Sequence, residues 1–120
     1  MASRDERIDA YYTRMRSEGA LDAMIRIVKA LDFKRLEPYT QRASQIKSKT
    51  LIIHGKNDRW VPIEDSYTLR RQIPDSVMAV IPDCGHVPQE EHPGITSGLI
   101  LNFLDGTLKK DTLLPAVAQP

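Results

Sequence analysis

Two short runs of apolar and β-branched residues constrain the fold of this chain more than any other feature of its sequence. The first run is Thr50–His54 and the second is Val77–Ile81, and polar residues or prolines border both. Uninterrupted runs of this length are typical of strands buried on both faces of a parallel sheet. Residues 64–73 between them have the pattern of a helix, which Pro74 ends. Strand, helix and strand in this order predict a βαβ unit with a right-handed crossover.

Helices are expected before, within and after this unit. In the N-terminal part, two sets of apolar residues recur at helical spacing: Ile8, Tyr11, Tyr12 and Met15, and then Leu21, Met24, Ile25, Val28 and Leu31. They predict a helical hairpin whose apolar faces need to be covered. The later helices are expected to direct these residues inward: Tyr67, Leu69 and Ile73 in the first, and Ile95, Leu99, Ile100, Phe103 and Leu104 in the last.

These elements together predict an α/β chain in three segments. Residues 1–45 are expected to be helical, residues 46–108 to form a β-α-β-α core, and residues 109–120 to be a flexible tail. The whole sequence of 120 residues has the length of one small domain.

Composition and charge exclude several classes of protein. Lysine and arginine number 17 against 16 aspartates and glutamates, so the net charge of +1 gives no reason to expect a nucleic acid or an anionic membrane as partner. A single cysteine cannot form an internal disulfide. The longest apolar run is too short to span a bilayer, and the N-terminus is charged where a signal peptide is apolar. We therefore expect a cytoplasmic globular chain.

Side chains suited to acid–base chemistry follow both predicted strands. Asp58 lies in the loop after the first strand, and His86 lies in the loop after the second. The carboxyl ends of parallel strands meet at one edge of a sheet, where ligands and catalytic side chains gather. If the two strands are direct neighbours, Asp58 and His86 can form a carboxylate–imidazole pair. In such a pair the carboxylate fixes the ring tautomer and stabilises the imidazolium that forms when the other nitrogen takes up a proton.

The two loops together resemble the C-terminal portion of the α/β-hydrolase superfamily. Residues 50–62 read TLIIHGKNDRWVP and are similar to its acid-bearing strand and loop, while residues 82–93 read PDCGHVPQEEHP and are similar to its histidine loop. The resemblance covers about residues 46–104, and the helical segment 1–45 looks like the family's lid. The Cys-Gly-His and Asn-Asp-Arg stretches are also similar to hydrolases that cleave carbon–carbon bonds of ring-cleavage products.

The resemblance implies roles for three of these residues. Asp58 is expected to be the triad acid and His86 the general base, while Glu91 is expected to support the histidine loop. The implied activity of the intact parent is hydrolysis of an ester or related small substrate. That chemistry requires no metal and no organic cofactor, so neither is expected.

The family's nucleophile and oxyanion hole cannot be found in this sequence. The nucleophile is carried on a G-x-S-x-G elbow that precedes the acid, and no serine here has both flanking glycines. Because nucleophile, base and oxyanion donors act as a unit, the isolated chain is expected to show no turnover above background. Only two strands of the family's sheet can be predicted, so an exposed sheet edge is expected, which a protein partner could cover.

Three interpretations stay open at this point. The chain is a truncated product or partial record of a hydrolase; or it is one half of a split or domain-swapped hydrolase whose partner supplies the nucleophile; or it is a non-catalytic interaction module that keeps the scaffold. The sequence identifies neither the substrate, nor the nucleophile, nor the oligomeric state.

Other residues that could carry chemistry have structural interpretations. Asp83 is a rival acid, but its closeness to His86 in the sequence places it poorly for reaching the ring. Cys84 is expected to be a small buried thiol rather than a nucleophile. Trp60 is expected either to line the substrate pocket or to anchor its ring against the end of the sheet.

The two remaining histidines are also expected to be structural. His54 is expected in the core and His92 at the start of the last helix. A zinc site built from His54, Cys84, His86 and His92 would fit no standard ligand spacing, so no metal site is predicted.

Overall fold

The computed structural model describes residues 4–31 and 38–115 of the chain. The chain forms two compact units, residues 1–37 and residues 38–120. The helical 3₁₀ turn η1 (Arg42–Gln45) therefore belongs with the second unit, where it contacts the helix α4 (Ile63–Gln72). These residues, which we expected in the N-terminal helical segment, thus contact the second unit.

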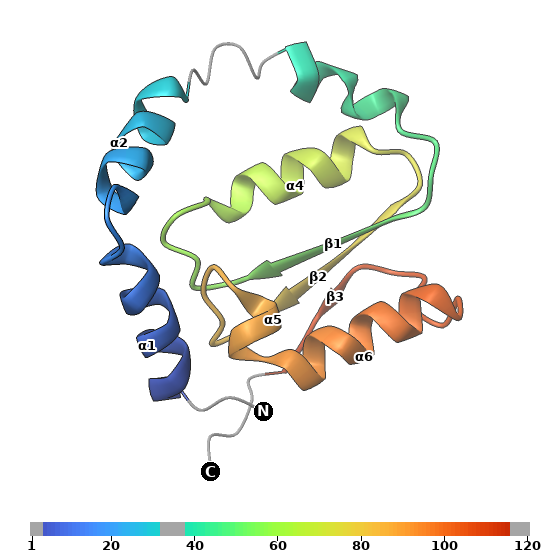
Figure 1. Cartoon of the computed structure of the whole chain (residues 1–120). Helices are drawn as coiled ribbons and strands as arrows, with labels where there is room; N and C mark the ends of the chain where they lie inside the picture. The colour runs from blue at the N-terminus through green and yellow to red at the C-terminus, as the bar shows by residue number, and fades with distance from the viewer. Residues whose placement is uncertain (1–3, 32–37, 116–120) are drawn as a thin grey trace. The chain divides into compact units, whose positions relative to one another are not determined.

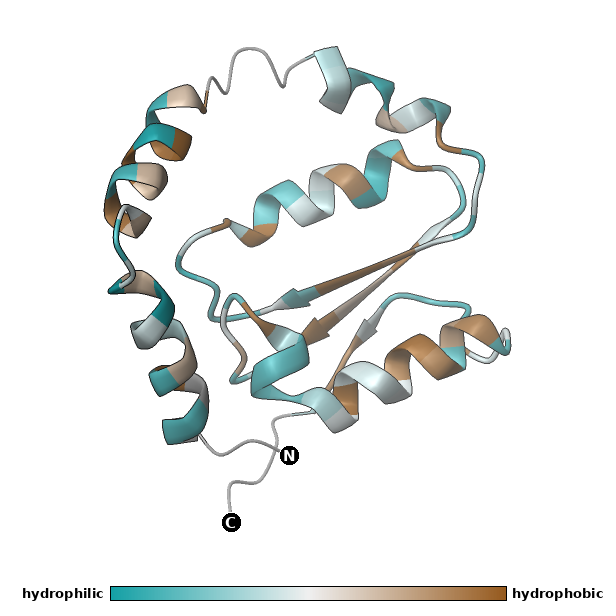
Figure 2. Cartoon of the chain, in the orientation of Figure 1, coloured by the Kyte–Doolittle hydropathy of each residue, from teal (hydrophilic) through white to brown (hydrophobic). Residues whose placement is uncertain are grey.

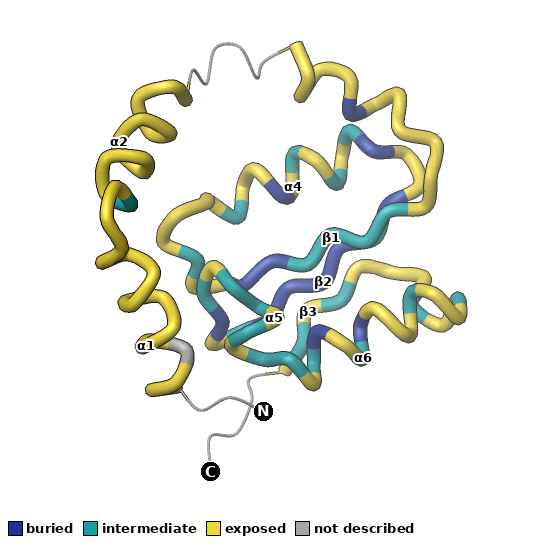
Figure 3. The backbone as a smooth tube through the Cα atoms, in the orientation of Figure 1, coloured by how far each residue is buried: buried dark blue, intermediate teal, exposed yellow. Residues whose placement is uncertain are grey.

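The described part of the first unit, residues 4–31, contains two helices, as the apolar spacing predicts. They are α1 (Arg4–Met15) and α2 (Ala20–Ala30), and Gly19 between them adopts a left-handed φ of 77° (Figure 1). The apolar residues of α2 recur along the helix, but none of its residues is buried (Figures 2 and 3). No helix in either described range has the length and apolarity needed to cross a membrane.

The second unit is built on a parallel sheet with the strand order β1-β2-β3. Strand β1 (Thr50–Gly55) pairs with β2 (Ser76–Ile81) in a register that runs from Thr50 opposite Ser76 to Gly55 opposite Ile81. Helix α4 connects these two strands along the chain. The βαβ unit and the direct neighbourhood of its two strands are therefore confirmed, so both following loops leave the sheet at the same edge.

The two faces of the sheet are covered by different helices. Helix α6 (Pro93–Leu104) packs on the face that carries Ala79 and Ile81, and Leu99 of α6 joins these residues in the core. Helix α4 covers the opposite face, as Figure 1 shows. Alternation of side chains along each strand divides the residues between the two faces.

Burial differs between the two predicted strands. All but one of the residues of β2 are buried, whereas β1 is buried only at its last two residues and half-buried elsewhere (Figure 3). The expectation that both strands are buried on both faces is therefore wrong for β1. The reason is position, because β2 is the central strand and β1 lies at the edge of the sheet that the described residues form.

A third strand, β3 (Thr112–Leu113), lies in the segment expected to be a flexible tail. It pairs in parallel with β2, with Thr112 opposite Ala79. The strand is tied to β2 by Asp111, whose Oδ1 accepts hydrogen bonds from the Arg70 side chain and the Met78 N–H, both at 2.8 Å. Residues 111–114 thus pair with or bond to the sheet, and residues 116–120 of the expected tail lie outside the described residues.

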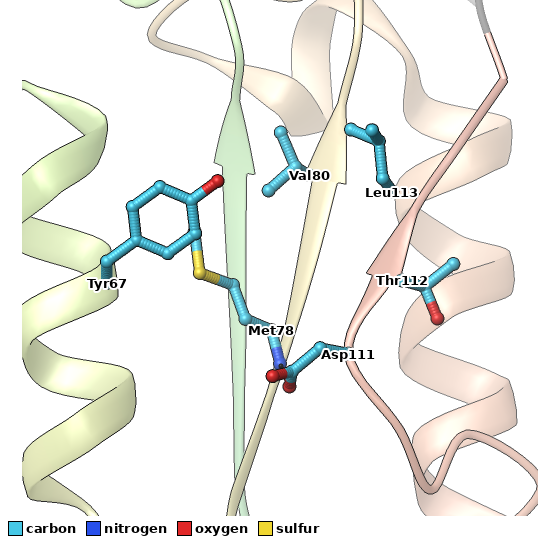
Figure 4. A pocket seen from close by; sticks show the side chains of 6 residues that line it. All are labelled: Tyr67, Met78, Val80, Asp111, Thr112 and Leu113. Atoms are coloured by element: carbon cyan, nitrogen blue, oxygen red, sulfur yellow. Dashed lines mark hydrogen bonds between the residues drawn. The ribbon is translucent and has the colours of Figure 1, made fainter.

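Helix α4 and strands β2 and β3 border a pocket of about 270 Å³. Figure 4 shows the side chains that line it, which are Tyr67, Met78, Val80, Asp111, Thr112 and Leu113. Tyr67 is 44% exposed, and Leu69 of the same helix is 36% exposed. Tyr67 is directed toward the sheet as expected (Figure 4), but neither Tyr67 nor Leu69 is buried. Ile73 is buried as expected, and Ser66 is the buried residue within α4.

Candidate active site

The loop after β1 folds around the carboxylate of Asp58. Its Oδ1 accepts hydrogen bonds from the backbone N–H groups of Trp60, at 2.8 Å, and Val61, at 3.1 Å. The Asp58 side chain is only 6% exposed. An aspartate that bonds backbone N–H groups two and three residues ahead stabilises a tight turn, so local sequence alone favours this conformation.

The loop after β2 is held by the carboxylate of Glu91, which lies at the end of the short helix α5 (Pro88–Glu91). Glu91 Oε2 accepts the N–H of Gly85 at 2.7 Å, and Oε1 accepts the N–H of Val87 at 3.0 Å. These two N–H groups flank His86 on either side. Glu91 therefore supports the histidine loop, as we expected from the resemblance.

Backbone hydrogen bonds join the two loops to each other. The N–H of Lys56 donates to Ile81 O, and the N–H of Asn57 donates to Cys84 O, both at 2.8 Å. Gly55 sits where the loops come closest, and a Cβ on it would lie 2.1 Å from Gly85 O. Only glycine allows this approach, so the relative position of the two loops is fixed by the backbone.

The fixed loops bring Asp58 and His86 together. Asp58 Oδ2 lies 2.9 Å from His86 Nδ1. Burial raises the pKa of Asp58, but the hydrogen bonds from His86 and from the Val61 and Trp60 N–H groups more than offset this and lower it to about 2. The carboxylate is thus ionised at neutral pH and can only accept hydrogen bonds. In the neutral ring this places the proton on Nδ1 of His86 and leaves a free lone pair on Nε2.

His86 is accessible while its partner is not. Its side chain is 49% exposed, compared with 6% for Asp58. A carboxylate behind an exposed imidazole can stabilise the imidazolium that forms when Nε2 takes up a proton, so this pair can act as a general base.

Trp60 adds an aromatic contact that the sequence analysis missed. Its ring stacks on the His86 ring with 6.0 Å between the centroids and 25° between the planes. The side chain is 83% exposed, so the expected anchoring against the end of the sheet is wrong. The only signal in the sequence is that an aromatic residue follows Asp58 two positions later.

Two other residues of the histidine loop, Asp83 and Cys84, are candidates for an alternative acid and an alternative nucleophile. Asp83 adopts a left-handed φ of 53°, and its backbone carbonyl accepts a hydrogen bond from His92 Nε2 at 3.1 Å. Cys84 is fully buried, and burial together with the negative charges of Glu91 and Asp58 raises its pKa to about 11. A buried thiol with a raised pKa is a poor nucleophile, as expected.

The remaining histidines have structural surroundings. His54 is 6% exposed, and its Nδ1 lies 2.8 Å from the Ser66 hydroxyl oxygen of α4. His92 stands between α5 and α6, at the start of the last helix, as expected. Among the residues that the structure describes, no group of three or more histidine, cysteine or acidic side chains is placed to hold a metal ion.

Comparisons with known proteins identify the fold family to which this chain is similar. The family model of the alpha/beta hydrolase fold matches residues 4–93. The chain is also similar to the 2-hydroxy-6-oxononadienedioate/2-hydroxy-6-oxononatrienedioate hydrolases of Escherichia coli strains K12 / DH10B and HS. Both are 38% identical to it over 85 residues, which are 69% of this chain and 30% of each relative. The chain thus spans less than a third of the length of these relatives, and no solved structure matches it.

Proposed function

We propose that this chain, which belongs to the alpha/beta hydrolase fold family, supplies the acid and the general base of a hydrolase active site. The observation that carries the proposal is the 2.9 Å contact between Asp58 Oδ2 and His86 Nδ1, at the edge where β1 and β2 end. In this proposal His86 Nε2 first takes the proton of a nucleophile and later activates a water molecule, while Asp58 stabilises the imidazolium.

The magnitudes expected for these two roles differ. A positioned general base contributes roughly 10²–10⁴-fold to a rate. Loss of the carboxylate that orients such a histidine costs about 10⁴-fold, because the ring then adopts the wrong tautomer. The ionised state of Asp58, supported by three hydrogen bonds, favours the productive tautomer of His86.

The nucleophile and the oxyanion donors are proposed to come from residues outside this sequence. No serine here carries the flanking glycines of a nucleophile elbow. They could belong to a further part of the same polypeptide or to a second chain. Strand β1 lies at the edge of the described sheet, and the same additional part would cover it.

The substrate of the complete enzyme is proposed to be an ester or a related small molecule. A second candidate is hydrolysis of a carbon–carbon bond in a hydroxy-oxo-dienedioate. The names of the E. coli relatives favour this candidate, because those proteins are hydrolases of 2-hydroxy-6-oxononadienedioate and 2-hydroxy-6-oxononatrienedioate by name.

A chimera tests the proposal, with residues 46–108 of this chain replacing the matching segment of the E. coli hydrolase. We expect the chimera to hydrolyse the relative's substrate and His86→Gln to abolish turnover. A serine-directed fluorophosphonate probe should label the chimera and leave the isolated chain unlabelled. Labelling of the isolated chain at one serine, or full activity of the His86→Gln chimera, would contradict the proposal. Activity that survives this substitution would favour the alternative of a non-catalytic interaction module.

A further inference from the structure

Trp60 contacts both members of the candidate pair. Its backbone contacts Asp58, and its side chain contacts His86. Its backbone N–H donates to Asp58 Oδ1 at 2.8 Å. Its indole stacks on the imidazole of His86, with a centroid separation of 6.0 Å and an interplanar angle of 25°. It is also the single tryptophan of the sequence.

Core packing does not account for the indole. The Trp60 side chain is 83% exposed, and the hydrophobic core lies on the sheet and on α6. The separation from His86 lies within the range of about 4.5–7 Å at which aromatic rings attract one another. The contact of the indole therefore serves the imidazole rather than the interior of the protein.

The imidazole needs a second contact. His86 is 49% exposed, and among the described residues Asp58 makes the hydrogen bond to its ring, at Nδ1, while Glu91 binds the backbone on either side. One hydrogen bond at a ring edge leaves the plane of the ring free to tilt. A stacked neighbour removes this freedom, and an aromatic pair of this kind changes an equilibrium by about two- to tenfold.

We propose that Trp60 is a positioning residue, whose indole holds the plane of the His86 imidazole so that Nδ1 stays on Asp58 and Nε2 faces the nucleophile. This inference rests on the proposed role of His86 as the general base. The loop after β1 would then have two roles. Its backbone binds the Asp58 carboxylate, and its Trp60 indole orients the His86 imidazole.

The structure separates the two contacts of Trp60 cleanly. The bond to Asp58 uses the backbone N–H, which every residue except proline provides at position 60. Replacement of the indole by a non-aromatic side chain therefore removes the stacking and leaves the turn around Asp58 intact. Because the indole is largely exposed, its removal takes little from the core, and the variants are expected to fold.

The test measures the Nδ1–H proton of His86 by NMR in the full chain at neutral pH. In the wild type we expect a low-field Nδ1–H signal and the Nδ1–H tautomer. Trp60→Phe keeps a stacked ring and should keep both. Trp60→Leu should accelerate solvent exchange of this proton by about two- to tenfold. Asp58→Asn, which replaces the carboxylate oxygen facing Nδ1 with an NH₂ donor, should abolish the signal.

A reciprocal measurement uses the single tryptophan as its own probe. His86→Leu should lower the fluorescence anisotropy of Trp60, because the indole loses its stacked partner. His92→Gln, on the same loop but away from the stack, should leave it unchanged. Unchanged Nδ1–H exchange in Trp60→Leu, or unchanged anisotropy in His86→Leu, would overturn the positioning role and leave the Asp58–His86 pair standing. A wild type without the Nδ1–H tautomer would instead contradict the proposed function itself.

Discussion

At the scale of single residues, the candidate site depends on Asp58 and its carboxylate. It accepts three hydrogen bonds, two from its own turn and one from His86. The two backbone bonds hold Oδ1, which leaves Oδ2 directed at the imidazole. A sequence can place Asp58 and His86 at one edge of a sheet. It does not show which carboxylate oxygen faces the ring or that Trp60 stacks on it, because both depend on the loop conformation.

The lowered pKa of Asp58 makes the stability of the chain sensitive to acid. Its pKa falls from 3.8 to about 2 in the folded state, so between these values the unfolded chain binds more protons. The contribution of Asp58 to the free energy of unfolding is therefore complete above about pH 4 and is lost as the pH falls toward 2. Urea unfolding at both pH values measures it. The difference between wild type and Asp58→Asn should shrink at the lower pH, and a constant difference would contradict this.

The buried thiol of Cys84 should be inert in the folded chain. Burial and two nearby carboxylates raise its pKa to about 11, so the thiolate is scarce at mildly alkaline pH. We expect iodoacetamide to leave the native protein unmodified over the time in which it alkylates the urea-unfolded protein completely. Mass spectrometry measures both. Equal rates in the two states would show that Cys84 is exposed and reactive.

At the scale of the elements, the close approach of two loops fixes the site. The loops after β1 and β2 share backbone hydrogen bonds, and Gly55 leaves no room for a side chain between them. Both strands could be predicted because each is an uninterrupted apolar run. Strand β3 could not, since two residues carry no pattern and its position depends on Asp111, which bonds to Arg70 and Met78 far away in the sequence.

Gly55→Ala should destabilise the second unit. A Cβ 2.1 Å from Gly85 O forces the backbone to shift, and overpacking of this kind typically costs about 1–3 kcal/mol. The matched control is Gly98→Ala in α6, where no atom lies within 4 Å of the added Cβ and where alanine should stabilise by roughly 0.5–1 kcal/mol. Chemical unfolding of both variants measures the difference. Similar stabilities would mean that the loops lie farther apart.

Strand β3 should open when Asp111 is replaced. The Leu114 N–H donates to Val80 O beside this strand, so its hydrogen exchange reports whether β3 stays on β2. Asp111→Ala removes the acceptor for Arg70 and for the Met78 N–H, and we expect the exchange of the Leu114 amide to accelerate. Asp105→Ala, whose carboxylate bonds Thr107, is the control and should leave it unchanged. Equal protection in both variants would assign the strand to other contacts.

At the scale of the whole molecule, the match to the alpha/beta hydrolase fold and the observed βαβ unit agree with the resemblance seen in the two loops. The two motifs were sufficient to predict the fold family, because each lies directly after a strand that can be predicted from its apolar residues. The apolar stripe of α2 was less informative, since a helical pattern does not say what covers it. The chain spans 30% of the length of its E. coli relatives, so the activity of a complete enzyme stays part of the proposal.

A comparison of two carboxylates at the same edge of the sheet distinguishes the roles of Asp58 as the acid and His86 as the base from those of bystanders. It compares kcat/KM of Asp58→Asn and Asp83→Asn in the active chimera with the E. coli relative. Both substitutions remove one carboxylate from the same edge of the sheet, but only Asp58 bonds His86. We expect a loss of about 10⁴-fold for Asp58→Asn and a change within about twofold for Asp83→Asn. Equal effects of the two substitutions, or a larger loss at Asp83, would contradict it.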